Sequence, residues 1–162
     1  MTEPVRPREL LERLVEAEVR FVVVGGLAVN AWGYLRGTQD VDIVPAPDGV
    51  NLQRLAALLE SLEGRIEVAE GKLGPGAIQT FLTAGDRTLV DTSLGPIDIL
   101  QGHPQVPSFA RLEADATDVD LGGLTIRVCS LDALLEMKRA STRPRDRDDV
   151  EALEAAHETP DS

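Results

Sequence analysis

Two aspartates separated by one residue are the pair in this sequence best placed to do chemistry. Asp40 and Asp42 lie in the run QDVDIV, whose apolar residues predict a strand. Alternate side chains of a strand point to one face, so the two carboxylates share a face and repel each other. A cation relieves that repulsion, and hard oxygen ligands suit Mg²⁺ or Mn²⁺. The pair therefore predicts a metal site.

A third carboxylate on a neighbouring strand would complete such a site. Asp98, in the apolar run PIDIL, is the preferred candidate, and Asp91, in TLVDT, is its rival. Both have a plainer interpretation, as a residue at the end of a strand. Asp91 is expected to lie closer to a loop, which favours Asp98.

Two adjacent glycines follow the apolar strand FVVV and precede a helix-like segment. Gly25 and Gly26 could be a plain turn that needs small residues. Alternatively, their backbone N–H groups could face a triphosphate at a helix N-terminus. The full G-x-G-x-x-G pattern of dinucleotide-binding proteins is absent, because positions 27–30 are LAVN.

In combination, Gly-Gly, a short helix and Asp-x-Asp on the next strand resemble the nucleotidyltransferase superfamily of the DNA polymerase β-like fold. The segment GGLAVNAWG and the following RGTQDVD are similar to AbiEii-type and related minimal nucleotidyltransferases. Many of these proteins belong to bacterial toxin–antitoxin or phage-defence systems. The resemblance extends to PIDIL and to a Lys138…Arg145-Asp146…Asp149 tail, and covers roughly residues 15–155.

The resemblance implies transfer of a nucleoside monophosphate from an NTP, such as ATP, to an acceptor hydroxyl. It implies that the catalytic acids, which also bind Mg²⁺ or Mn²⁺, are Asp40, Asp42 and Asp98, and that the nucleotide-binding residues are Gly25, Gly26, Arg36, Thr38, Lys138 and Arg145. Asp98 would also help to deprotonate the attacking hydroxyl. The acceptor stays open between tRNA, protein and small molecules such as antibiotics, and a toxin would have an antitoxin partner.

Several of these residues also have structural interpretations. Arg36 could pair with an acid, and Lys138 could complement the dipole at a helix C-terminus. Arg145 and its neighbours could form a solvated charged face, with Asp149 as a structural anchor. A non-catalytic nucleotide- or partner-binding module that keeps the fold is the alternative function. The presence of all three acids argues against it.

The composition suits one soluble globular domain over residues 1–162. The resemblance implies that this domain has the α/β nucleotidyltransferase fold, with a mixed, mostly antiparallel sheet flanked by helices. The net charge of −12 argues against a broad nucleic-acid surface, although residues 138–147 form a local basic patch. Cys129 stands alone, which excludes an internal disulfide, and is expected to be buried. No apolar run is long enough for a signal or a membrane span, so a cytoplasmic protein without membrane contact is expected.

Periodicity and capping signals place the remaining elements. Helices are predicted over residues 7–18, 26–34, 49–62 and 146–157, and from Ser130 onward, with Asp48 and Ser130 as N-caps. Strands are predicted over residues 19–24, 40–44, 77–82, 87–91, 96–101 and 125–129, and loops over 71–76 and 102–107.

Overall fold

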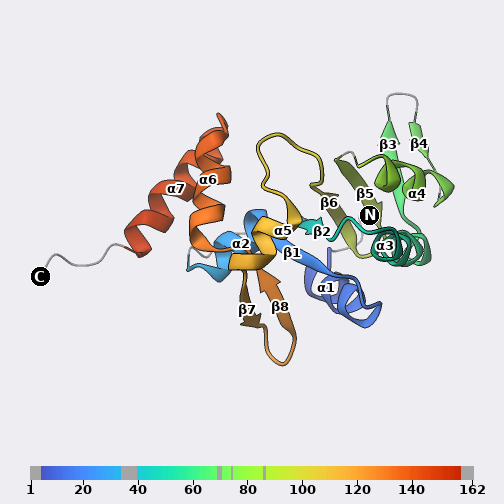
Figure 1. Ribbon diagram of the computed structural model, residues 1–162, viewed down its shortest axis with the longest axis horizontal. Coiled ribbons are helices and arrows are strands. Elements are labelled where there is room, and N and C mark those ends of the chain that lie inside the picture. Colours follow the sequence, from blue (N-terminus) through green and yellow to red (C-terminus); the bar gives the residue numbers. More distant parts are fainter. Residues whose placement is uncertain (1–4, 34–39, 69–70, 74, 86, 158–162) are drawn as a thin grey trace, which may run out of the picture.

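The computed structural model describes residues 5–33, 40–68, 71–73, 75–85 and 87–157. These residues form one eight-stranded sheet with helices packed on it, in the strand order β4-β3-β5-β6-β2-β1-β8-β7. Helices α6 and α7 lie side by side at one end of the molecule, and β3, β4 and α4 lie at the other (Figure 1).

The helices are α1 (Pro7–Glu16), α2 (Gly25–Ala31), α3 (Gly49–Ser61), α4 (Pro75–Ala84), α5 (Phe109–Asp115), α6 (Leu131–Ala140) and α7 (Pro144–Ala156). The strands are β1 (Phe21–Val24), β2 (Val41–Pro45), β3 (Arg65–Val68), β4 (Gly71–Leu73), β5 (Thr88–Thr92), β6 (Gly95–Ile99), β7 (Thr117–Asp120) and β8 (Thr125–Val128).

The sheet is mixed and mostly antiparallel, as the sequence predicts. Strand β2 runs parallel to β6, and β1 runs parallel to β8, while the other five described pairings are antiparallel. A parallel pair cannot be joined by a tight turn and needs a longer crossover. Between β2 and β6 that crossover contains α3, β3, β4, α4 and β5. The two acidic segments DVDIV and PIDIL therefore become neighbours although they lie far apart in the sequence.

One face of the central strands is almost wholly apolar. Val23, Ile43 and Ile99 have no exposed surface and lie on adjacent strands. Because side chains alternate along a strand, the residues on either side of them point to the opposite face. That opposite face holds Asp42 and Asp98, so the core side of the sheet fixes which side carries the acids.

The capping predictions are confirmed. Asp48 accepts a hydrogen bond from the backbone N–H of Asn51 at the start of α3, at 3.0 Å. Ser130 accepts one from Ala133 at the start of α6, at 3.1 Å. These side chains satisfy N–H groups that have no partner inside the helix. Pro144 occupies the first turn of α7, where its missing N–H costs nothing.

Two element predictions are wrong. Residues 77–82, predicted as a strand, belong to helix α4, and residues 71–76, predicted as a loop, contain β4 and the start of α4. Within α4, Ile78 and Leu82 are both fully buried, one helical turn apart. A short apolar run fits the period of a strand and of a helix equally well, so only packing distinguishes them. The sequence analysis also missed β3, β7 and α5.

No helix in the described part of the chain has the length and apolar character needed to span a membrane.

Candidate active site

Four side chains form a row across four adjacent strands. The strand register places Val24 of β1 opposite Asp42 of β2, Asp42 beside Asp98 of β6, and Asp98 opposite Leu89 of β5. All four line one cavity of about 500 Å³. The register therefore selects Asp98 as the acid next to Asp42. Asp91 lies opposite Pro96 and is not among the described residues that line the cavity.

The glycine pair holds the carboxylate of Asp42 at the start of α2. Gly25 has a φ of +67°, and a Cβ added there would overlap the side chain of Asp42. The backbone of Gly26 hydrogen-bonds to the Asp42 carboxylate. Both glycines belong to the first turn of α2 rather than to a loop before it. Close approach and left-handed backbone conformation together explain why glycine is needed at position 25.

Asp42 sits in an environment that disfavours its charge. Burial is the main cause, and the nearby carboxylates of Asp98 and Asp40 add to it, so that the pKa of Asp42 rises to about 6. Lys138 and the Gly26 hydrogen bond act in the opposite direction. A buried carboxylate with two acidic neighbours gains from a bound cation.

Arg87 supplies a cation on the far side of Asp98. Its Nε donates to one oxygen of Asp98 at 3.1 Å, and its Nη2 donates to the other at 2.6 Å. Such a two-bond arrangement is the strong form of an arginine–carboxylate pair. The Arg87 side chain is 53 % exposed, whereas that of Asp98 is 12 % exposed. Arg87 therefore reaches in from solvent to cover a nearly buried acid.

The opposite wall of the cavity is formed by the junction of α6 and α7. The Nζ of Lys138 lies 2.7 Å from Asp146 and 3.1 Å from Asp149, and all three residues are buried. Arg143 also donates to Asp146 through Nε, at 2.8 Å. Burial alone would raise the pKa of Asp146, but hydrogen bonds from Lys138, Ser141 and Arg143 outweigh it and lower that pKa. This buried ion cluster joins the C-terminal turn of α6 to the first half of α7.

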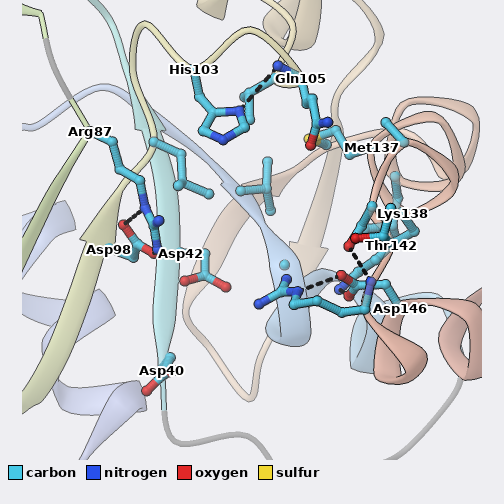
Figure 2. A pocket seen from close by; sticks show the side chains of 18 of the residues that line it. Asp40, Asp42, Arg87, Asp98, His103, Gln105, Met137, Lys138, Thr142 and Asp146 are labelled. Atoms are coloured by element: carbon cyan, nitrogen blue, oxygen red, sulfur yellow. Dashed lines mark hydrogen bonds and ion pairs between the residues drawn. The ribbon is translucent and has the colours of Figure 1, made fainter.

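The two walls face each other across the cavity (Figure 2). The strand wall carries Asp42, Asp98 and Arg87, and the helix wall carries Lys138 and Asp146. The segment after β6 closes a third side with His103 and Gln105, where the backbone N–H of Gln105 donates to Nδ1 of His103 at 3.1 Å. Apolar surface in the cavity comes from Leu89, Leu100, Val106, Leu134 and Met137.

The acids fit a metal ion in chemistry but only partly in geometry. Asp42 and Asp98 lie together, whereas Asp40 is exposed at the end of β2 and stands apart from them (Figure 2). Within the described residues, no three acidic, histidine or cysteine side chains are grouped so that they could hold one ion. Mg²⁺ takes six oxygen ligands and usually keeps several waters or substrate phosphates among them. Two carboxylates therefore form a partial site that suits a metal bound together with phosphate.

The structure gathers some of the residues expected in the site and separates others. Gly25, Asp40, Asp42, Asp98 and Lys138 all line the cavity. Arg36 and Thr38 lie outside the described residues. Arg145 is exposed on the first turn of α7 and is not among the described lining residues, whereas Arg143 is.

Sequence reasoning missed Arg87 and the segment around His103. Arg87 precedes a strand by one residue, and nothing in its neighbours signals a pairing with Asp98, eleven positions later. That pairing depends on the antiparallel register of β5 and β6. Cys129 is fully buried, and burial raises the pKa of its thiol to about 12, which excludes a thiolate nucleophile at neutral pH.

The fold is similar to those of known nucleotidyltransferases. Lincomycin-bound LnuA, a lincosamide antibiotic adenylyltransferase, matches with a TM-score of 0.67 at 18 % identity, over 95 % of this chain and 99 % of that one. ANT(2″)-Ia in complex with adenylyl-2″-tobramycin matches with a TM-score of 0.56 at 15 % identity, over 92 % and 86 %. A nucleotidyltransferase-like protein from Paracoccidioides brasiliensis matches with a TM-score of 0.58 at 16 % identity, over 91 % and 72 %.

Neither protein-family profiles nor the sequences of curated proteins give a match to this chain. The structural similarities, at identities of 15–18 %, establish the nucleotidyltransferase fold.

Proposed function

We propose that this protein is a metal-dependent nucleotidyltransferase, which transfers a nucleoside monophosphate from an NTP to an acceptor hydroxyl. The observation that carries the proposal is the in-register pair of Asp42 and Asp98 in a cavity of a nucleotidyltransferase fold. In this reaction the acceptor oxygen bonds to the α-phosphorus, the bond from that phosphorus to the bridging oxygen breaks, and pyrophosphate leaves.

The residues of the cavity would have different roles in this reaction. Asp42 and Asp98 would hold Mg²⁺ or Mn²⁺, with Asp40 drawn in by rotation of its exposed side chain. When bound, the ion would neutralise phosphate charge and polarise the reacting groups. Asp98 accepts the proton of the attacking hydroxyl, and the backbone at Gly25, which lines the cavity, would receive phosphate oxygens, while that of Gly26 holds Asp42.

The acceptor that the cavity favours is a small molecule with both apolar and hydroxylated surface. Leu89 is 45 % exposed beside Asp98, and Leu100, Val106 and Met137 continue an apolar wall from it. The net charge of −12 opposes the approach of a large nucleic acid. LnuA and ANT(2″)-Ia, which share the fold, are antibiotic-modifying proteins. A toxin acting on tRNA or protein, with an antitoxin partner, remains a prediction of the sequence resemblance alone.

The test combines nucleotide binding with label transfer. Purified protein is incubated with each α-³²P-labelled NTP and Mg²⁺ or Mn²⁺, with a lincosamide, an aminoglycoside, total tRNA or no acceptor. We expect pyrophosphate release and label on a small acceptor, both lost in Asp42→Asn. Asp91→Asn serves as the matched control, because it alters an acid of the same sheet outside the cavity lining.

Three outcomes would change the proposal, each in a different way. Metal-dependent nucleotide binding without any pyrophosphate release would favour the non-catalytic binding module. Label on tRNA or protein instead of a small molecule would keep the reaction and replace the acceptor. Nucleotide binding that is the same in wild type and Asp42→Asn would remove Asp42 from the site.

A further inference from the structure

We infer that Arg87 competes with the divalent metal for Asp98 and thereby sets the metal affinity of the site. This inference rests on the proposed function, because it takes Asp98 as a metal ligand. Arg87 then determines how tightly the site binds a metal ion. It neutralises Asp98 while no metal is bound, and it has to release Asp98 when the ion enters.

The first observation is that Arg87 engages both oxygens of Asp98, at 3.1 and 2.6 Å. With this guanidinium in place, only 12 % of the Asp98 side chain is exposed. Mg²⁺ binds a carboxylate oxygen at about 2.0–2.1 Å, so it would lie close to the guanidinium on the same group. Two cations that share one carboxylate repel each other, and the pair and the metal complex are therefore alternatives.

The second observation is that Arg87 can leave Asp98 without disturbing the core. Its side chain is 53 % exposed, and it lies before the first residue of β5 rather than within the strand. By contrast, Lys138 on the opposite wall is held by two buried carboxylates and has a side-chain exposure of 10 %. Of these two cations, Arg87 is the more exposed one, and its contact with Asp98 is the one that can be exchanged for a metal ion.

The third observation is that Asp42 and Asp98, although they lie together, are held by different neighbours. Asp98 is paired with Arg87, which lies just before β5 (Figure 2). The backbone of Gly26, in α2, hydrogen-bonds to Asp42. Each acid is therefore stabilised by a different neighbour. Release of Asp98 by Arg87 frees the oxygens that a shared ion would use.

Nitrogen NMR tests the exchange directly in the protein of residues 1–162. The Nε–H signals are recorded on ¹⁵N-arginine-labelled protein, and the Arg87 signal is assigned from its loss in Arg87→Lys. Adding Mg²⁺ should move this signal to the position of a solvated arginine. The inference is overturned if backbone signals of Asp42 and Gly26, recorded on uniformly ¹⁵N-labelled protein, report Mg²⁺ binding while the Arg87 signal does not change.

Metal affinity provides the second test, measured as Mn²⁺ binding by electron paramagnetic resonance without nucleotide. Arg87→Gln should tighten Mn²⁺ binding by about fivefold to tenfold, the effect expected for losing a competing two-bond ion pair that is half exposed. Arg143→Gln is the matched control, because it removes an equal charge from the same cavity without touching Asp98. If Mn²⁺ binding tightened equally in Arg87→Gln and Arg143→Gln, the cause would be the loss of a positive charge in general, and the inference that Arg87 competes for Asp98 would be overturned.

The variant Asp42→Asn distinguishes a failure of this inference from a failure of the proposed function. If Mn²⁺ binding depends on Asp42 but not on Arg87, the inference fails and the proposed metal site stands. If Asp42→Asn binds Mn²⁺ as well as wild type does, the metal site and the inference both fail. Circular dichroism on each variant establishes that the comparison is made between folded proteins.

Discussion

Gly25 lies so close to Asp42 that no side chain can be added at position 25 without displacing the carboxylate. The glycine also has a φ of +67°, a conformation that other residues adopt only with strain. The backbone turn at the start of α2 and the placement of the acid therefore depend on one another. This relationship leads to the first prediction.

Gly25→Ala should destabilise the fold and move Asp42 away from Asp98. Gly85→Ala is the control, since Gly85 has a similar φ of +79° but open space around the added Cβ. Backbone strain alone costs about 1–2 kcal/mol, and Gly25→Ala should exceed the cost of Gly85→Ala because of the overlap. Thermal unfolding and Mn²⁺ binding measure the two effects. Equal losses of stability and unchanged metal binding would contradict the close-approach argument.

Asp42→Asn should stabilise the metal-free protein at neutral pH. The pKa of Asp42 is raised to about 6, mainly by burial, from an ordinary value of 3.8. Its folded form thus binds a proton more tightly than its unfolded form, so the charge costs stability as pH rises from about 4 to about 6. The amide should recover about 1–3 kcal/mol at pH 7–8 and almost nothing at pH 4.

Urea unfolding in EDTA across this pH range measures the gain, with Asp148→Asn on the exposed face of α7 as control. A gain for Asp42→Asn that is the same at pH 4 and pH 8 would show that its charge is not the cause.

The third prediction distinguishes the two rival acids by kinetics. Asp98→Asn should lower kcat much more than it raises the KM for the nucleotide, because its role is at the reacting centre. Asp91→Asn should leave both constants close to wild type, because it lies opposite Pro96, outside the cavity lining. Steady-state kinetics on a working acceptor measures both. A reversed result would assign the catalytic role to Asp91.

The fourth prediction concerns the buried cluster on the helix wall. Lys138→Met would leave the carboxylates of Asp146 and Asp149 buried without their shared ammonium. Removing one partner of a buried pair costs about 3–5 kcal/mol, well above the 0.3–1 kcal/mol expected for a cation at a helix end. Arg139 is the next residue along α6 and forms an exposed ion pair with Glu154. Breaking this pair in Arg139→Met should lower the free energy of unfolding by at most about 1 kcal/mol.

Denaturant unfolding of the two variants checks this difference. A loss of stability in Lys138→Met no larger than that in Arg139→Met would show that the cluster contributes little. The binding of phosphate by Lys138, expected from the sequence resemblance, is checked separately. The KM for NTP of Lys138→Met should rise at low salt and rise less as salt screens the charge.

The sequence determined the features that depend on neighbours along the chain. Alternation within DVDIV and PIDIL put Asp42 and Asp98 on the polar sides of buried strands, and Asp48 and Ser130 signalled the helix starts that they cap. These are local effects of strand pleating and of N–H groups left over at a helix end, so a single segment contains the information. The prediction of a mixed sheet came from the resemblance of these segments to nucleotidyltransferases.

Tertiary structure alone decided the features that depend on register and packing. Pairing of β2 with β6 placed Asp98 rather than Asp91 beside Asp42, and pairing of β5 with β6 brought Arg87 to Asp98. Helix α4 formed where the apolar run allowed either period: Ile78 and Leu82, both fully buried, would share one face in a strand as well as in a helix, so packing against the rest of the molecule decided between them. Contacts between distant segments set these outcomes. The free energy of such a contact is gained only when the sheet assembles, so a local sequence pattern does not predict it.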